Sequence, residues 1–233
     1  MHVPDGFLDT TTSITTGVVA AGAIALCLRG ARRELDDRTA PLAGIVAAFV
    51  FAAQMINFPV AAGTSGHLLG GALATALVGP WTGALCVTVV LIVQALLFAD
   101  GGLSALGTNV LLMAVCTVAV SYGVMRLLLR VLPRRRRSVL IATFGGAFLS
   151  VPASALMFVA LYGIGGAVDV PLGTLAGAML TVHLIIGIGE ALITTLVVGT
   201  VLSTRPDLVR IARGVRRPLE VRSPGAAAHA ESS

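Results

Sequence analysis

The first two residues, Met1 and His2, present three nitrogen atoms that could chelate a metal ion. These are the α-amine of Met1, the backbone amide nitrogen of His2 and Nδ1 of its imidazole. The amine and the amide close a five-membered ring on the ion, and the amide and Nδ1 close a six-membered ring. Ni(II) or Cu(II) can displace the amide proton, and a tetragonal field of nitrogen donors suits these ions.

One more nitrogen would complete the plane, and His67 is the natural candidate. It ends the segment NFPVAAGTSGH, whose small residues favour tight turns. Asn57, Thr64 and Ser65 of this segment could hydrogen-bond the ligands, or they could cap helices. Spacing alone leaves two alternatives open, because most chains that begin Met-His bind no metal there and His67 could instead cap the next helix.

Three further polar residues are candidates for the same site or for a transport path. Asp100 precedes two glycines and could attract cations or orient a ligand, although an Asp-Gly turn explains it equally well. His183 and Glu190 are seven residues apart and therefore lie nearly on one helix face. Both lie in an apolar stretch, where ionisable groups are costly and usually functional. They could form a polar pair on the release path, but we favour a structural pair or an anchor for the N-terminal segment.

The composition indicates a membrane protein. Hydrophobic residues make up 56% of the 233 residues and charged residues only 12%, and the mean hydropathy is +0.95. A soluble domain carries about 25% charged residues. All 16 basic residues are arginine, which excludes a Walker A phosphate loop and a Schiff-base lysine. No nucleophile–base pair or carboxylate dyad stands out, so the sequence predicts a protein that is not an enzyme.

The elements that must position these residues are helices. Apolar stretches predict an all-α bundle of about seven transmembrane helices, at 12–30, 40–57, 68–79, 82–99, 105–131, 138–162 and 173–203. The third is too short to span a membrane alone. If it is re-entrant, six helices span.

The arginines predict the topology of the bundle. They follow the first helix, separate the fifth from the sixth, and fill the tail, so with seven helices all lie on one side. The positive-inside rule makes that side cytoplasmic, with the N-terminus outside. This placement explains the basic charge without nucleic acid. We expect a membrane domain over residues 1–204, a disordered cytoplasmic tail over 205–233, and retention of the starting methionine beside the bulky His2.

Four separated motifs resemble one known family. The segments MHVPDGFLD, NFPVAAGTSGHLLGG, LLFADGGLSALGTN and HLIIGIGEALIT are similar to the CbiM/NikM family, the substrate-specific components of energy-coupling factor (ECF) transporters for cobalt and nickel. The resemblance runs from residue 1 to about residue 208. It implies a metal site formed by Met1, His2 and His67, in a helical bundle whose N-terminal segment inserts from outside.

The resemblance therefore predicts a membrane subunit that captures Co²⁺ or Ni²⁺ outside a bacterial cytoplasmic membrane. It also implies partners: a transmembrane coupling subunit, cytoplasmic ATPase subunits and, if used, a separate small accessory membrane subunit. The ion is then the substrate, and no permanently bound cofactor is expected. The alternative is a haem or redox membrane protein with His67 and His183 as axial ligands. The sequence does not separate cobalt from nickel.

Overall fold

Helices form at every predicted apolar stretch. The computed structural model describes residues 1–37, 39–56, 58–61 and 64–213. Its helices are α1 (Thr10–Ala31), α2 (Thr39–Gln54), α3 (Gly71–Val78), α4 (Pro80–Leu97), α5 (Leu106–Asn109), the π-helical η1 (Val110–Cys116), α6 (Thr117–Val131), α7 (Arg136–Gly165) and α8 (Leu172–Thr204). The segments α5, η1 and α6 form one continuous helix, which matches the predicted fifth helix.

The second helix is shorter than predicted. It ends at Gln54, and the chain then forms the short antiparallel strands β1 (Phe58–Ala61) and β2 (Thr64–Gly66). Proline at position 59 explains the early end, because it has no N–H for a helix and restricts the residue before it to extended conformations. The side chain of Gln54 donates a 2.7 Å hydrogen bond to the carbonyl of Leu69, which ties α2 to the segment after the strands.

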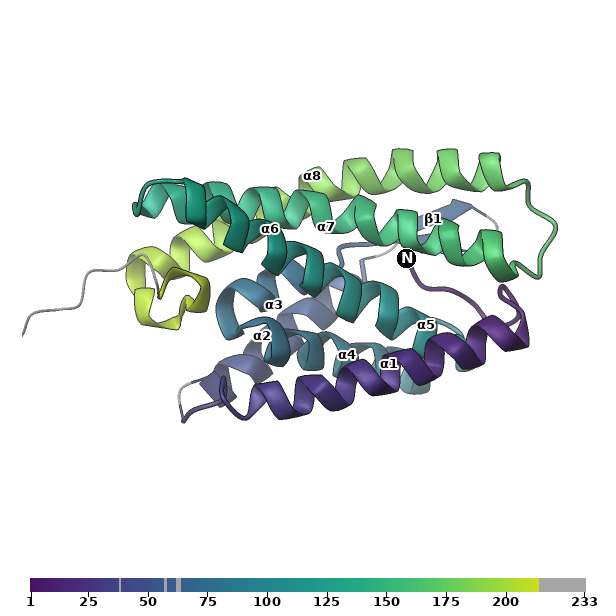
Figure 1. The fold of residues 1–233 in the computed structure, drawn as a ribbon, viewed down its shortest axis with the longest axis horizontal. Coiled ribbons are helices and arrows are strands. Elements are labelled where there is room, and N and C mark those ends of the chain that lie inside the picture. Colours follow the sequence, from purple (N-terminus) through teal and green to yellow (C-terminus); the bar gives the residue numbers. More distant parts are fainter. Residues whose placement is uncertain (38, 57, 62–63, 214–233) are drawn as a thin grey trace, which may run out of the picture.

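The long helices α7 and α8 run side by side along the whole length of the bundle, and α1 lies on the opposite edge (Figure 1). The short α3 is completely buried between them, with every residue from Gly71 to Val78 in the interior. Its length of 8 residues confirms that it cannot span a membrane alone. Among the described residues, five helices are long and apolar enough to do so: α1, α4, the continuous helix Leu106–Val131, α7 and α8.

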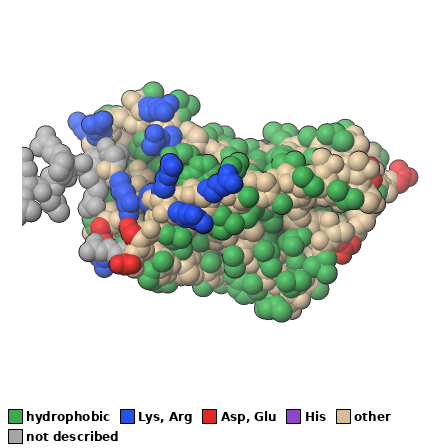
Figure 2. Space-filling model, turned by 60° about the horizontal axis from the view of Figure 1, so that its bottom comes forward, with side chains coloured by type: hydrophobic (Ala, Val, Ile, Leu, Met, Phe, Trp, Pro, Cys, Tyr) green, Lys and Arg blue, Asp and Glu red, His purple; other side chains and the backbone are tan. Residues whose placement is uncertain are grey.

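The exterior of the bundle is apolar. Large hydrophobic side chains are widely exposed, including Val18 at 69%, Ile164 at 78% and Leu196 at 69%. Soluble monomers rarely expose such extensive apolar surface, whereas lipid-facing helices do. Figure 2 shows the arginines gathered at one end of the molecule. We call this the arginine end. The protein is thus a multi-pass membrane protein, and the arginines among its described residues lie at one end.

The N-terminal segment folds back into the bundle. Figure 1 places the N-terminus among the helices rather than at an end of the molecule. Asp9 caps α1 by accepting a 2.7 Å hydrogen bond from the backbone N–H of Thr12, so the chain reverses direction there. Before the reversal, Phe7 is 2% exposed and packs on the rings of Phe158 and Tyr162. This aromatic contact fixes the segment against α7.

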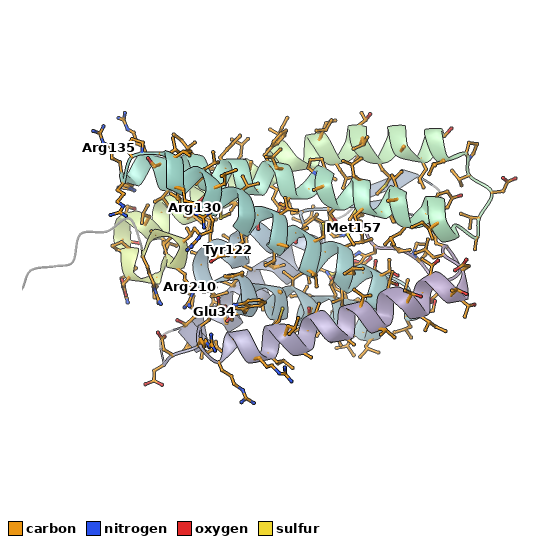
Figure 3. The ribbon with its side chains drawn as sticks, viewed as in Figure 1. Glu34, Tyr122, Arg130, Arg135, Met157 and Arg210 are labelled. Carbon is orange, nitrogen blue, oxygen red and sulfur yellow. The ribbon has the colours of Figure 1, made fainter. Side chains whose placement is uncertain are left out.

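The chain after α8 turns back onto the arginine end. Residues 206–208 and 210–212 form two short 3₁₀ turns, and Val209 and Ala212 are buried at 0% and 1% exposure. Figure 3 shows Arg210 beside Glu34 at this end. The first part of the predicted tail is therefore packed on the bundle. The rest of it, 214–233, lies outside the described residues.

Candidate metal centre

The first three residues form a buried extended segment held by Asn109. Met1, His2 and Val3 are 1%, 4% and 0% exposed. The side-chain amide of Asn109 accepts a 2.8 Å hydrogen bond from the N–H of Val3 and donates one of 3.1 Å to its carbonyl. That carbonyl also accepts from the N–H of Gly102 at 2.9 Å. The segment is thus held by the same kind of paired hydrogen bonds that a neighbouring strand would supply.

The α-amine of Met1 lies 2.6 Å from Nε2 of His67. The other ring nitrogen of His67, Nδ1, lies 2.7 Å from the carbonyl oxygen of Leu68. A carbonyl oxygen can only accept, so Nδ1 carries the proton and Nε2 presents its lone pair toward the amine. The sequence predicted that Met1 and His67 meet, and the structure brings them together.

His2 lies beside the same pair, with its ring held by two polar side chains. Its ring centroid is 4.6 Å from that of His67. Its Nδ1 lies 3.0 Å from a carboxylate oxygen of Asp100, and its Nε2 lies 3.2 Å from the side-chain oxygen of Gln94. Asp100 therefore reaches the predicted ligand His2 directly. In this arrangement Nδ1 faces the carboxylate rather than the amine.

Burial favours the neutral forms of the two nitrogen donors. It lowers the pKa of the Met1 amine well below 8.0, and the charge of Asp100 offsets this only in part. Burial, the amine and the imidazoles of His2 and His183 together hold the pKa of His67 well below 6.5. Burial therefore favours the forms of both donors whose lone pairs are available for a metal ion.

His183 and Glu190 lie on one face of α8 but bond to different parts of the chain. Glu190 accepts hydrogen bonds from the backbone N–H groups of Leu69 and Gly70 at 2.5 and 2.7 Å. It therefore anchors the loop after His67. Nδ1 of His183 lies 2.8 Å from the carbonyl of Met179, and its buried Nε2 has no hydrogen-bond partner among the described residues.

The remaining predicted residues have no described contact with the metal centre. Thr64 and Ser65 lie in β2, and Asn57 lies outside the described residues. Sequence analysis missed Gln94 and Asn109, which hold His2 and Val3. Gln94 could have been found as a polar residue in an otherwise apolar helix, where such residues are costly unless bonded. Asn109 could not, because only the fold brings it to a segment 106 residues away.

A metal ion at this site needs main-chain nitrogen. Within the described part of the chain, no group of three or more His, Cys, Asp or Glu side chains is arranged to hold a metal ion. Adding the amine of Met1 to the rings of His2 and His67 changes this, because it supplies a donor 2.6 Å from His67. The N-terminus itself is thus the feature that makes this a candidate metal centre.

Comparisons with known proteins agree on metal transport. The family model CbiM, described as "Cobalt uptake substrate-specific transmembrane region", matches residues 2–208. A protein of Haloquadratum walsbyi whose name describes metal transport is 41% identical, over 90% of this chain and 93% of that protein. The fused nickel transport protein NikMN of Rhodobacter capsulatus is 32% identical, over 94% of this chain and 66% of that protein. A crystal structure of a transition metal transporter superposes with a TM-score of 0.80 at 30% identity, covering 87% of this chain and 93% of the other.

Proposed function

Because the chain belongs to the CbiM family, and is thus a membrane component of a cobalt or nickel transporter, we propose that it captures the ion with its own N-terminus. The proposed ligands are the amine of Met1, the backbone nitrogen and Nδ1 of His2, and Nε2 of His67. The single observation that carries the proposal is the 2.6 Å approach of the Met1 amine to Nε2 of His67.

That distance fits neighbouring ligands of one ion. Two nitrogen donors at right angles, each about 2.0 Å from a metal ion, are about 2.8 Å apart. In the metal-free protein a hydrogen bond joins these two atoms across nearly the same distance. An ion can therefore bind between the two donors with little movement of either, once the neutral amine turns its lone pair toward the ion. His2 needs more adjustment, because its Nδ1 must exchange the contact with Asp100 for the ion.

Asp100 supports the proposal through charge. A divalent ion bound by a deprotonated amide has one positive charge left, and the neutral imidazoles and amine add none. The carboxylate of Asp100, 3.0 Å from His2 Nδ1, balances that charge. Buried charge is costly unless it is compensated. The loaded site would then be neutral overall.

His183 is the proposed next contact on the inward path. Its lone pair at Nε2 is buried and unpartnered among the described residues, and it lies on the same helix face as Glu190, which bonds to the loop after His67. His183→Gln should leave equilibrium binding of the ion nearly unchanged and slow its delivery by the assembled transporter. A variant that delivers the ion at the wild-type rate would contradict this part of the proposal.

The energy for delivery would come from other subunits. We propose an ECF-type assembly with a membrane coupling subunit and cytoplasmic ATPases, with the arginine end in the cytoplasm. The named relatives that fuse a further component to the nickel protein support a multi-component transporter.

The haem alternative has less support. Nε2 of His67, the atom that would bind haem iron, lies 2.6 Å from the amine of Met1. A porphyrin could reach it only by displacing the buried N-terminal segment. Binding of the iron by His183 as the second axial ligand would not restore the contacts that the N-terminal segment loses.

The test is titration with Ni²⁺ and Co²⁺ of the protein with its native N-terminus, beside a variant with Gly-Ser added before Met1. A variant with Gly-Ser added after Ser233 is the control. We expect one tightly bound ion per native or control chain, and affinity reduced by more than about 100-fold in the N-terminal variant. Equal binding by all three proteins would show that the amine is not a ligand.

A further inference from the structure

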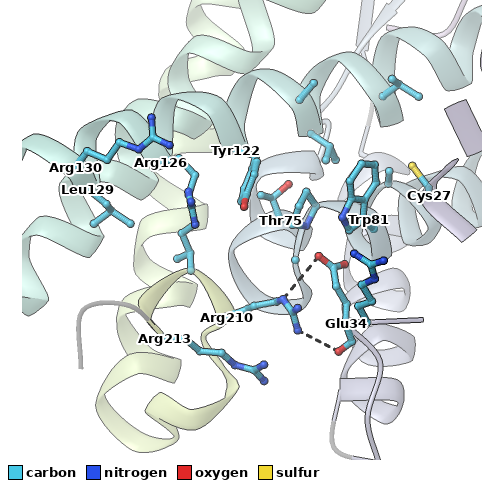
Figure 4. A pocket seen from close by; sticks show the side chains of 18 of the residues that line it. Cys27, Glu34, Thr75, Trp81, Tyr122, Arg126, Leu129, Arg130, Arg210 and Arg213 are labelled. Atoms are coloured by element: carbon cyan, nitrogen blue, oxygen red, sulfur yellow. Dashed lines mark hydrogen bonds and ion pairs between the residues drawn. The ribbon is translucent and has the colours of Figure 1, made fainter. Parts of the chain in front are cut away.

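A cavity at the arginine end has no part in capturing the ion. It measures about 970 Å³ and lies between the ends of α1, α3, α4 and α6 and the turns after α8 (Figure 4). Six arginines line it and Glu34 is the one carboxylate among the described residues that do, which gives a formal charge of +5. The arginines are Arg33, Arg126, Arg130, Arg134, Arg210 and Arg213.

Only part of this positive charge is neutralised within the described chain. Arg210 lies 3.7 Å from Glu34 and also donates to its backbone carbonyl at 3.1 Å. Arg213 lies 3.9 Å from Asp36. The other four lining arginines pair with no carboxylate among the described residues. Like charges this close repel one another, so an anion in the cavity would relieve the repulsion.

Two of these four arginines, Arg126 and Arg130, project from one face of α6 over an apolar wall. Tyr122, Arg126 and Arg130 follow at intervals of four residues and so share that face. The guanidinium of Arg126 lies over the ring of Tyr122, 5.7 Å from its centroid. Toward the middle of the bundle the lining becomes apolar, with Val115 of η1, Val118 and Ala119 of α6, and Ala84 of α4. The cavity is therefore cationic at one end and apolar at the other.

The surfaces on either side of the cavity are apolar and exposed. Leu26 and Leu28 of α1 are 57% and 56% exposed, and Leu127 and Val131 of α6 are 60% and 72% exposed. Trp81, which lines the cavity, is 43% exposed. Tryptophan and arginine beside lipid-facing leucine mark the level at which the headgroups of a bilayer lie.

We propose that this cavity binds the headgroup of an anionic phospholipid from the leaflet at the arginine end. The phosphate lies against Arg126 and Arg130, whose planar guanidinium groups can each donate two hydrogen bonds to phosphate oxygens. The acyl chains follow the apolar wall and the exposed leucines of α6. A soluble anion would leave that wall unused. Arginines that only set the membrane topology need no particular arrangement on their side of the membrane. These arginines surround a cavity that is half apolar, and this arrangement points to a lipid.

The experiment uses the full chain in dodecyl maltoside mixed with palmitoyl-oleoyl phosphatidylglycerol or phosphatidylcholine. Native mass spectrometry counts retained lipid, and thermal unfolding reports its effect. We expect the protein to retain phosphatidylglycerol in preference to phosphatidylcholine, with a saturable rise in the unfolding midpoint. Arg126→Gln with Arg130→Gln should weaken retention about 10- to 30-fold.

The matched control is Arg135→Gln with Arg137→Gln. It removes the same charge from the same end, where Arg135 lies at the edge of the bundle, outside the cavity (Figure 3). We expect it to retain phosphatidylglycerol like the wild type. An equal loss in both double variants would show diffuse attraction and overturn the proposal. If the glutamine pair fails to fold, Arg126→Lys with Arg130→Lys keeps the charge, and retention as tight as that of the wild type would exclude bidentate recognition.

Three other outcomes would also overturn the proposal. The first is equal retention of the two lipids. The second is displacement of phosphatidylglycerol by millimolar inorganic phosphate, which would mean that the cavity takes a soluble anion. The third is binding of polyglutamate without binding of phosphatidylglycerol, which would mean that it takes an acidic polypeptide. Nickel titration of each variant separates this inference from the metal proposal, because neither arginine pair touches the metal centre.

Discussion

Glu190 on α8 accepts a 2.5 Å hydrogen bond from the backbone N–H of Leu69, two residues after His67. It accepts a second from Gly70, the residue that precedes α3 in a left-handed conformation and offers no side-chain cap. The free N–H groups and the dipole at the start of a helix favour an anion there. The carboxylate of one helix thus caps another and fixes the loop that presents His67.

Glu190→Gln should therefore weaken metal binding without touching a ligand. An amide has one acceptor oxygen and no charge, so one of the two backbone N–H groups loses its partner. We expect Ni²⁺ affinity to fall about tenfold and the free energy of unfolding to fall by about 1–3 kcal/mol. Calorimetric titration and thermal unfolding measure these effects. Asp207→Asn, the same change in an exposed ion pair with Arg205, is the control. Wild-type affinity in Glu190→Gln would contradict the prediction.

Asp100→Asn tests the balance of charge at the site. Without the carboxylate the loaded site carries a net positive charge, so we expect Ni²⁺ and Co²⁺ to bind about 10- to 100-fold more weakly. The direction of the change in affinity is informative, because Asp100 raises the pKa of the Met1 amine. Its removal should ease competition by protons and, by that route alone, strengthen binding. Asp169→Asn, an exposed acid in the loop between α7 and α8, controls for general attraction of cations. Equal losses in the two variants would favour that explanation.

The number of protons released on binding follows from the lowered pKa values. Burial lowers the pKa values of the Met1 amine and of His67, so these two donors hold few protons to release at pH 7.5, whereas the amide of His2 gives up one. We expect about one proton per bound ion. A peptide of residues 1–5, whose amine has an ordinary pKa, should release about two. Titration in buffers of different ionisation enthalpy measures this. Release of two protons by the protein would mean that its amine is charged before the ion arrives.

The same pKa shifts set the acid limit of binding. Protons compete with the metal ion for the amine and for His67 only when the pH falls to the lowered pKa of each group. That pKa is well below 8.0 for the amine and well below 6.5 for His67. Above that range, affinity should change by about tenfold per pH unit, as expected for loss of one proton. Below it the dependence should become steeper. A slope already steeper than this between pH 7 and pH 8 would contradict the assignment.

Asn109→Asp should release the N-terminal segment. The carboxylate cannot donate to the carbonyl of Val3 and repels it, so both the hydrogen bond and the fit of the segment are lost. We expect faster amide hydrogen exchange over residues 1–9 and at least about tenfold weaker metal binding. Thr108→Val, the neighbouring buried residue that bonds to Thr16 of α1, is the control and should bind metal normally. Unchanged exchange in Asn109→Asp would show that the segment is held by other contacts.

The sequence predicts the helices well, because hydropathy and turn residues act locally. It placed the ends of α7 and α8 within three residues, but it extended α2 past the point where Pro59 ends it. It also predicted that Met1, His2 and His67 meet, although only resemblance supplied the decisive step. Long-range pairings were out of reach. Glu190 was expected to pair with His183 or to anchor the N-terminal segment, yet it bonds to a loop 121 residues away, because two unsatisfied backbone N–H groups lie there.

The N-terminal segment bonds to residues that lie far along the sequence. Met1 bonds to His67 and Val3 bonds to Asn109. The backbone of Phe7 pairs with Ala167 beyond the end of α7. Contacts so distant in sequence are slow to form, because a long loop must close for each of them. The contacts of the N-terminal segment are therefore complete only when α7 is in place, because Ala167 follows that helix. Tight metal binding should then report completed membrane insertion, and biosynthesis that stops before residue 167 should yield chains unable to acquire the ion.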